Sequence, residues 1–309
     1  MAGPGPAFCA AIDWGTTNLR LWLMDEAGRV LGERTSGEGM RACLPDRFAA
    51  VMETHLEALG APADLPVVVA GMAGARGAWR EAAYLDTPAP LDALHSHAVR
   101  VEGLGRDVRI LPGVCRRTAG CEDVMRGEET QLAGARAARH GTGLFCLPGT
   151  HSKWAWLEAG RLTAFTTFMT GELFAILSEH SILAETVGAD GEPASSAFTD
   201  AVGEMLEEGA GLTGRLFTIR AAALLGRGAP AEASARLSGL LIGAEVAAMR
   251  ARCEGAGEVF LVAGGAQARA YEAALTAAGF GCRNLDGGAL VRQGLFFAAR
   301  ALWPERTIA

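Results

Sequence analysis

Residues 10–23 read Ala-Ala-Ile-Asp-Trp-Gly-Thr-Thr-Asn-Leu-Arg-Leu-Trp-Leu, a pattern that predicts a buried strand, a tight polar turn and a second strand. The turn carries a carboxylate, a glycine, two hydroxyls and an amide. Glycine lets the backbone approach a ligand closely, and N–H groups and hydroxyls can donate to phosphate oxygens. Asp13 offers the hard oxygen that Mg²⁺ prefers, through water. The stretch therefore suits a phosphate tail with its metal ion; the alternative is an ordinary β-hairpin with a polar loop.

Composition limits the class of protein. The chain has 309 residues, half of them hydrophobic, so it can bury a large core and we expect two domains. A net charge of −7 without a basic block argues against a dedicated nucleic-acid binder. No apolar run of about 18 residues occurs, so we expect no transmembrane helix. Residues 1–7 are expected to be a flexible leader and not a signal peptide.

The cysteines and histidines are scattered along the chain. There are seven cysteines, an odd number, without a C-x-x-C pair, and six dispersed histidines. This pattern favours free thiols in a reducing cytosol over disulfides or zinc, so we expect a cytoplasmic protein. His95 and His97 lack acidic or cysteine partners at metal-site spacing, so we expect them on the surface.

The opening pattern returns in the second half of the chain. Residues 144–157 read Leu-Phe-Cys-Leu-Pro-Gly-Thr-His-Ser-Lys-Trp-Ala-Trp-Leu and predict another strand, a Gly-Thr turn and a strand. Residues 259–267 predict a strand, a glycine turn and a helix start, and residues 124–136 predict a turn that leads into a helix. The other elements that we expect are helices at 45–59, after 171, and at about 195–208, 231–253 and 289–302, strands at 65–70, 108–114 and 162–169, and a glycine-rich connector at 71–77.

The glycine-bearing turns at Gly15, Gly149 and Gly264 stand in a specific order, with Gly-Glu-Glu at 127–129 before the second. This order resembles that of the sugar-kinase, actin and heat-shock-chaperone ATPase superfamily: first phosphate loop, catalytic acid, second phosphate loop, adenosine loop. The resemblance implies an α/β fold of two related ribonuclease-H-like (actin-like ATPase) lobes, with mixed sheets flanked by helices and a cleft between them. We expect an N-terminal lobe at 8–130 on the sugar-acid side and a C-terminal lobe at 131–309, with the last helix able to pack back on the first lobe.

Four longer motifs resemble the 2-dehydro-3-deoxygalactonokinase family. They are Ile-Asp-Trp-Gly-Thr-Thr-Asn-Leu-Arg at 12–20, Met-Arg-Gly-Glu-Glu-Thr-Gln-Leu at 125–132, Leu-Pro-Gly-Thr-His-Ser-Lys-Trp at 147–154 and Ser-Gly-Leu-Leu-Ile-Gly-Ala-Glu at 238–245. The resemblance covers residues 8–300. It implies a carbohydrate kinase that uses ATP and Mg²⁺ to phosphorylate the 6-hydroxyl of 2-dehydro-3-deoxy-D-galactonate in galactonate catabolism.

The resemblance also implies roles for individual residues. The residues expected at the nucleotide are Asp13 for hydrated Mg²⁺, Gly15, Thr16, Thr17, Asn18 and Arg20 at the first phosphate loop, Gly149, Thr150, His151 and Ser152 at the second, and Gly264 and Gly265 at adenosine. Lys153 is the only lysine of the chain. It would contact a phosphate or the acid's carboxylate, or else be a solvated charge at a strand edge. The two adjacent glycines could equally form a plain strand-to-helix turn.

Related kinases carry an aspartate after a glycine just before the second hairpin. The resemblance therefore implies that Glu128, which takes that place after Gly127, is the catalytic base, with Glu129 as second candidate and a glutamate in place of the aspartate. Acidic residues also favour the first turn of a helix for electrostatic reasons alone, so a purely structural role is the alternative. The acid substrate needs a cationic partner, for which we select Arg76 and Arg126, and Glu38 could bind sugar hydroxyls. All three could equally be surface residues.

The sequence also fits two other functions. The same fold could phosphorylate another sugar or sugar acid, or the chain could be a non-catalytic nucleotide-binding protein. An oxidoreductase is disfavoured, because no G-x-G-x-x-G follows a strand with an acidic residue further along. We expect a small sugar acid and ATP as partners, without nucleic acid or membrane, and leave open whether the chain forms a homodimer.

Overall fold

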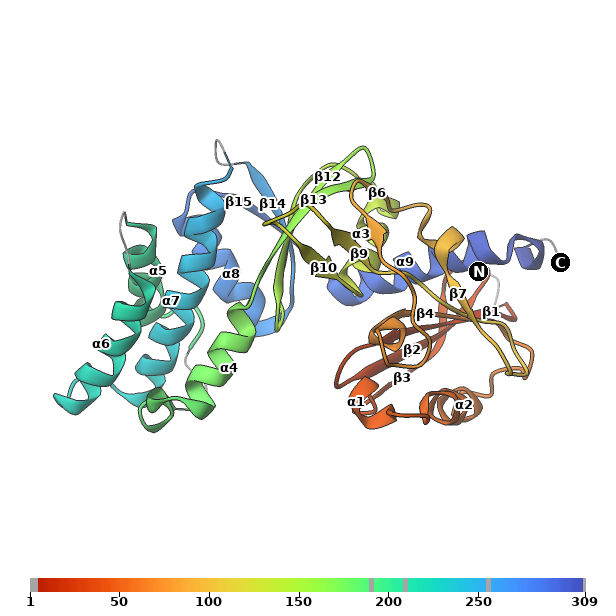
Figure 1. Ribbon diagram of the computed structural model, residues 1–309, viewed down its shortest axis with the longest axis horizontal. Coiled ribbons are helices and arrows are strands. Elements are labelled where there is room, and N and C mark those ends of the chain that lie inside the picture. Colours follow the sequence, from red (N-terminus) through yellow and green to blue (C-terminus); the bar gives the residue numbers. More distant parts are fainter. Residues whose placement is uncertain (1–4, 189–191, 208–210, 254–256, 308–309) are drawn as a thin grey trace. The chain divides into compact units, whose positions relative to one another are not determined.

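The computed structural model describes residues 5–188, 192–207, 211–253 and 257–307 (Figure 1). The chain divides into two compact units. Unit 1 contains Met1–Thr142, Trp156–Phe165 and Gly287–Ala309, and unit 2 contains Gly143–Ala155 and Thr166–Asp286. Most of the expected leader, residues 1–4, lies outside the described residues, and the first strand begins at Ala7.

Unit 1 combines short strands with helices from both ends of the chain. Its strands are β1 (Ala7–Trp14), β2 (Leu19–Asp25), β3 (Val30–Ser36), β4 (Val67–Gly71), β5 (Leu85–Asp86), β6 (Ala89–Pro90), β7 (Val99–Val101), β8 (Val108–Ile110), β9 (Val114–Arg116) and β10 (Asp123–Met125). Its helices are α1 (Met40–Cys43), α2 (Phe48–Ala58), α3 (Glu128–Ala137) and α9 (Gly287–Leu302), with 3-10 turns η1 (Met72–Gly74), η2 (Leu94–His97) and η4 (Pro304–Thr307).

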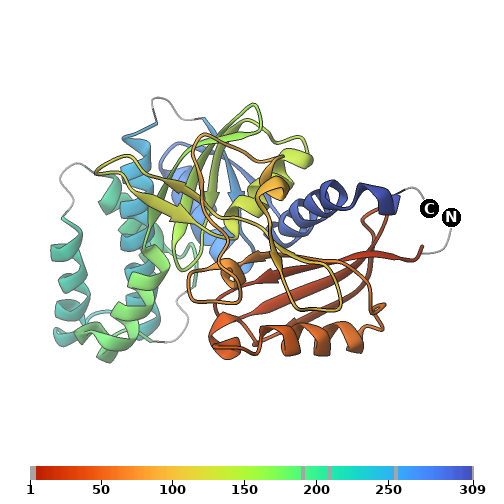
Figure 2. The same ribbon diagram turned by 45° about the vertical axis from the view of Figure 1, so that its right-hand side comes forward.

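The main sheet of unit 1 has the order β3-β2-β1-β4-β8-β7. Strand β2 is antiparallel to both of its neighbours, β1 and β3, whereas β4 is parallel to β1 and β8. Successive side chains of a strand point to opposite faces, so Ile12 and Trp14 pack in the core under α2, while Cys9 and Ala11 pack against α9. Figure 2 shows α2 and α9 on the two sides of this sheet. The buried run at 65–70 is thereby confirmed as a central strand.

Unit 2 repeats this plan with a larger helical insertion. Its elements are β11 (Gly143–Leu147), β12 (Ser152–Glu158), β13 (Arg161–Phe168), α4 (Thr170–His180), η3 (Ile182–Glu185), α5 (Ser196–Leu206), α6 (Leu212–Leu224), α7 (Pro230–Arg250), β14 (Glu258–Val262), α8 (Gly265–Ala277) and β15 (Gly281–Leu285). The last residues of β12 and the first residues of β13 belong to unit 1. The strand order is β15-β14-β11-β12-β13-β6, with β14 parallel to β11 and β15. Strand β6 pairs with the part of β13 that lies in unit 1.

Both sheets therefore share one order, in which three consecutive strands lie beside two strands that are parallel to the first of the three. In unit 1 the series is β3-β2-β1-β4-β8, and in unit 2 it is β13-β12-β11-β14-β15. In the chain, helices follow the first strand of each series as written: α1 and α2 follow β3 in unit 1, and α4 to α7 follow β13 in unit 2. The expected α/β fold of two related halves, with mixed sheets flanked by helices, is confirmed.

One helix of unit 2, α6, was not predicted. Apolar residues occur on all sides of it, and among its residues only Ile219 is buried, whereas Phe217 and Leu224 are exposed. A helix without one apolar face gives no periodic signal in the sequence.

Candidate functional site

Asp13 and Arg20 face each other across the hairpin of β1 and β2, because they are register partners in the antiparallel pair. The Oδ2 atom of Asp13 accepts hydrogen bonds from Nη2 of Arg20 at 2.6 Å and from its Nε at 3.2 Å. Burial raises the pKa of the Asp13 carboxyl, and Arg20 opposes this rise. The negative charge of Glu128 raises the pKa of Asp13 further. Two predicted site carboxylates therefore interact within unit 1.

The turn of the first hairpin is held by the segment that enters α1. Residues 39–41 donate three backbone hydrogen bonds to the carbonyl oxygens of residues 15–17, at distances of 2.9 to 3.2 Å. Thr17 and Asn18 remain exposed at the tip of the turn. A turn fixed from one side and exposed on the other suits donation from its hydroxyls and amide to a phosphate.

Helix α3 begins with the two candidate bases, which lie in different environments. Glu128 is half-buried, and its Oε2 accepts the backbone N–H of Arg126 at 3.1 Å. Glu129 is 1% exposed, and its carboxyl accepts the N–H of Gly127 at 2.7 Å and the hydroxyl of Thr130 at 3.1 Å. Burial, and then the charge of Glu128, raise the pKa of Glu129 to about 8. The contacts of Glu129 are thus those of a group that closes the start of its own helix.

The guanidinium of Arg126 uses only part of its hydrogen-bonding capacity. It stacks on the ring of Tyr84, 4.4 Å from the centroid, and Nη2 donates to the carbonyl of Ala82 at 2.7 Å. Its Nε and Nη1 are buried and have no hydrogen-bond partner among the described residues. Arg76 is exposed on the connector after β4, and the carboxylate of Glu38 lies beside the imidazole of His55.

The second hairpin, between β11 and β12, carries the second set of predicted residues. Nε2 of His151 lies 2.8 Å from Oε2 of Glu172 on α4, and Thr150 is exposed. Lys153 is only 4% exposed, and its Nζ donates to the carbonyl of His151 at 3.0 Å. The alternative of a solvated strand-edge charge is therefore wrong, because β12 is buried along this part.

Ser152 of this hairpin belongs to a buried network around Glu245 of α7. The carboxylate of Glu245 accepts the hydroxyl of Ser152 at 2.6 Å, the indole N–H of Trp154 at 2.8 Å, the hydroxyl of Tyr271 at 2.9 Å and that of Thr170. Burial raises the pKa of Glu245, and these four donors oppose the rise. Sequence reasoning included Glu245 in a motif but missed this role, since its partners come from three other elements.

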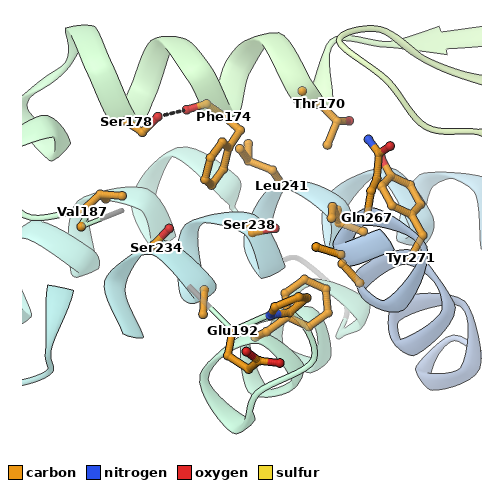
Figure 3. A pocket seen from close by; sticks show the side chains of 18 of the residues that line it. Thr170, Phe174, Ser178, Val187, Glu192, Ser234, Ser238, Leu241, Gln267 and Tyr271 are labelled. Atoms are coloured by element: carbon orange, nitrogen blue, oxygen red, sulfur yellow. Dashed lines mark hydrogen bonds between the residues drawn. The ribbon is translucent and has the colours of Figure 1, made fainter. Parts of the chain in front are cut away.

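A cavity of about 590 Å³ lies in unit 2 beside this network (Figure 3). Residues of α4, α7 and α8 line it, among them Thr170, Phe174, Ser238, Gln267 and Tyr271, and Gly149 of the hairpin borders it. Gly264 and Gly265 directly precede its α8 lining, and open space adjoins the Cα of both glycines. A mixed apolar and polar cavity next to exposed backbone suits a flat heterocycle with polar edges.

The sequence predicts free cysteine thiols and surface positions for His95 and His97. All seven cysteines are free thiols. His97 is exposed as expected, whereas His95 is partly buried. None of the described helices is long and apolar enough to cross a membrane. Within the described part of the chain, no three His, Cys, Asp or Glu residues group as a metal site, so a metal held by Asp13 would need waters and phosphates as its other ligands.

Comparison with known proteins gives one consistent result. The model of the 2-keto-3-deoxy-galactonokinase family matches residues 13–298. The chain is 48% identical to "Probable 2-dehydro-3-deoxygalactonokinase DgoK1" of Rhizobium meliloti (strain 1021), covering 96% of this chain and 98% of that protein. It is 37% identical to 2-dehydro-3-deoxygalactonokinase of Escherichia coli (strain K12), covering 94% and 97%.

A solved structure agrees with these relatives. The crystal structure of a Sinorhizobium meliloti protein assigned as a 2-dehydro-3-deoxygalactonokinase superposes with a TM-score of 0.93 at 46% identity, over 96% of this chain and 100% of that one. The family match spans both hairpins, the start of α3 and the cavity of unit 2. The chain belongs to the 2-keto-3-deoxy-galactonokinase family.

Proposed function

We propose that this chain is a carbohydrate kinase that transfers the γ-phosphoryl group of ATP to the 6-hydroxyl of 2-dehydro-3-deoxy-D-galactonate, in galactonate catabolism. Similarity over nearly the full length to proteins named for this activity supports the proposal. The structural observation that carries it is the proximity of the end of β1, with Asp13, to the start of α3, with Glu128. Gly127, which precedes Glu128, lies against Gly71 of β4, and Gly71 is the register partner of Trp14. The charge of Glu128 accordingly raises the pKa of Asp13. Phosphoryl transfer needs positioning, charge neutralisation and a carboxylate that accepts the alcohol proton.

In this proposal Glu128 is the base. The acceptor hydroxyl oxygen forms a bond to the γ-phosphorus, the bond from that phosphorus to the bridging oxygen breaks, ADP leaves, and the hydroxyl proton passes to the Glu128 carboxylate. Its half-buried position leaves it reachable, whereas Glu129 is enclosed by its own helix start. We therefore give Glu129 a structural role.

Asp13 is proposed to hold hydrated Mg²⁺ through Oδ1, because Arg20 binds the other carboxylate oxygen, Oδ2. A carboxylate oxygen is a ligand that Mg²⁺ prefers. When bound, Mg²⁺ would neutralise charge on the phosphates. Gly15, Thr16, Thr17 and Asn18 would contact the β- and γ-phosphates. Arg20 would keep Asp13 in place and add positive charge to the loop.

Unit 2 is proposed to hold the rest of the nucleotide. Adenosine would occupy the cavity lined by Ser238, Gln267 and Tyr271, with Gly264 and Gly265 against it. The turn at 149–151 would contact phosphates, and Lys153 would add charge beneath it. Ser152 already donates to Glu245, so we assign its hydroxyl to holding the hairpin rather than to a phosphate.

The sugar acid is proposed to bind in unit 1. Arg126 has two buried nitrogens available for a carboxylate, and a buried carboxylate needs such a partner. Arg76 would add charge from the connector, and Glu38 would accept a sugar hydroxyl. We take the two units as the functional division, so that residues 131–142 and 287–309, which the sequence predicts to be part of the second lobe, belong with the first. We also propose a cytoplasmic location and a homodimer, the latter to be tested by sedimentation.

The test is a coupled ADP-release assay with Mg-ATP and a panel of acceptors. The panel contains 2-dehydro-3-deoxygalactonate, 2-dehydro-3-deoxygluconate, galactonate, galactose and glycerol. Turnover confined to the first, or to the first two, is expected. Turnover with another member alone would assign a different acceptor, and ATP binding without any turnover would favour the non-catalytic alternative.

A further inference from the structure

Glu38 ends a chain of three side chains in unit 1. Arg34 of β3 donates from Nε to Nδ1 of His55 at 2.9 Å, and Nε2 of His55 lies 2.9 Å from Oε2 of Glu38. Arg34 reaches the imidazole because its register partner is Leu21, which packs in the core under α2. His55 is buried on α2, whereas Arg34 is exposed.

The chemistry of Arg34 determines the tautomer of His55. A guanidinium donates and does not accept, so the Nδ1 atom that receives its bond must be unprotonated. The neutral imidazole then carries its proton on Nε2, where it faces the carboxylate of Glu38. The ring is therefore a directed relay that accepts from Arg34 and donates to Glu38.

This relay leaves Glu38 oriented and still accessible. One oxygen, Oε2, is bound by His55, and the other, Oε1, lies 4.0 Å from Nη2 of Arg47, beyond hydrogen-bond distance. The Glu38 side chain is 39% exposed. Its backbone is fixed to the first hairpin, because its carbonyl accepts the indole N–H of Trp14 at 3.0 Å. An acceptor oxygen of fixed direction is thus presented beside the predicted phosphate turn.

We propose that His55, held by Arg34, is a positioning residue that fixes Glu38 as the acceptor for one hydroxyl of the sugar acid. This inference rests on the proposed function and adds to it a source of substrate selectivity. A site built to accept a hydrogen bond from a hydroxyl discriminates strongly against a substrate that lacks or misplaces it. Glu38, held by His55, accepts a hydrogen bond from that hydroxyl. The phosphoryl transfer itself does not require this hydrogen bond.

A double-mutant cycle on His55 and Glu38 tests the relay. His55→Leu is expected to raise KM for the sugar acid about tenfold and to leave KM for ATP within about twofold, because a hydrogen bond to a charged group is lost in acceptor binding only. In a Glu38→Gln background His55→Leu should then add no more than about twofold. Additive effects of the two changes would overturn the proposal, since a histidine that only packs acts regardless of residue 38.

Two further variants separate positioning from folding. His55→Gln can accept from Arg34 through its amide oxygen and donate to Glu38 through its amide nitrogen, so it should restore most of the sugar-acid KM. Arg34→Ala removes the hydrogen bond to Nδ1 of His55 without opening a cavity in the core, because the Arg34 side chain is exposed. It should raise the KM for the sugar acid several-fold. Glu33→Ala, on the exposed neighbour in β3, is the matched control and should change neither constant. A Glu33→Ala effect equal to that of Arg34→Ala would contradict the proposal.

The tautomer can be measured without activity, by long-range ¹H–¹⁵N spectra of histidine-labelled protein with His55 assigned from the His55→Gln spectrum. A neutral ring protonated at Nε2 is expected in the wild-type chain. A ring protonated at Nδ1, or at both nitrogens at pH 7.5, overturns the relay whatever the enzyme does. Absence of any sugar-acid-dependent ADP release by the wild-type chain would instead overturn the proposed function, so the two failures are distinguishable.

Discussion

The hairpins of β1–β2 and β11–β12 use the same backbone arrangement in the two units. In each, the carbonyl of a turn threonine accepts an N–H from the start of a helix, from Gly39 to Thr17 at 3.2 Å and from Glu172 to Thr150 at 2.9 Å. In each, a glycine permits the close approach, since a Cβ at Gly39 or Gly171 would overlap the backbone of the turn. The geometry of the turn therefore comes from the main chain and from one missing side-chain atom.

The side chains on the two hairpins differ in kind. The first carries a charged pair, Asp13 and Arg20, whose carboxylate also interacts with Glu128. The second carries Ser152 and Trp154, which donate to the buried Glu245 and tie the turn to α7. The comparison teaches that the same backbone arrangement can carry a charged pair in unit 1 and a rigid attachment to a buried carboxylate in unit 2.

The largest effect is expected at Glu128, the proposed base, at the start of α3 in unit 1. Glu128→Gln should lower kcat by about 10²–10⁴-fold and leave ATP affinity nearly unchanged, because a general base acts in the transition state. Steady-state kinetics and calorimetric titration with ATP measure the two quantities. Glu129→Gln is the matched control and should retain most of kcat. If Glu129→Gln abolished turnover while Glu128→Gln did not, the assignment of the base would be reversed.

A matched pair of variants tests the different purposes of the hairpins directly. Asp13→Asn should lower kcat by about 10²-fold, since it weakens the proposed binding of hydrated Mg²⁺, with little change in the free energy of unfolding. Ser152→Ala should do the opposite, costing about 1–3 kcal/mol of unfolding free energy because Glu245 loses a buried donor. Urea denaturation and steady-state rates for both variants provide the measurement. If Asp13→Asn and Ser152→Ala lowered kcat equally, the two hairpins would not differ in purpose as described.

Local signals explain how much of this could be predicted from the sequence. Both hairpins and the start of α3 follow from short apolar runs, glycine turns and acidic first-turn residues, all within about 15 residues. The partners of Glu245 lie 26 to 93 residues away, and Arg34 lies 21 residues from His55, so neither cluster has a local signature. Burial of Lys153 likewise depends on what packs over β12, which a strand pattern does not reveal.

Matching substitutions can disturb the backbone contact that Gly39 makes with the first turn and Gly171 makes with the second. Gly39→Ala and Gly171→Ala should each lower the free energy of unfolding by about 1–3 kcal/mol, since the added methyl group must displace the turn. Gly37→Ala is a control in the same loop as Gly39, because a Cβ there meets no atom within 4 Å. A neutral result at only one of the two glycines would show that the two turns are not held alike.

The smallest effect concerns the buried carboxyl at the start of α3. The pKa of Glu129 is raised from 4.5 to about 8 in the folded chain, first by burial and then by the charge of Glu128. The folded state therefore binds more protons than the unfolded state between these values, and stability falls as pH rises from 4.5 through 8. Glu129→Gln replaces this titratable carboxyl group by a neutral amide, whose oxygen can still accept the N–H of Gly127.

The advantage of Glu129→Gln in melting temperature should therefore be absent near pH 4 and grow to a few degrees by pH 8.5, as measured by calorimetry across that range. Glu33→Gln, at an exposed position, should show no such trend. A constant difference between Glu129→Gln and wild type at all pH values would mean that the amide changes the helix start by its hydrogen bonds and not by its charge. Glu245 offers the parallel in unit 2, because burial raises its pKa too. Its four donors oppose that rise, so Glu245→Gln should destabilise unit 2 where Glu129→Gln stabilises unit 1.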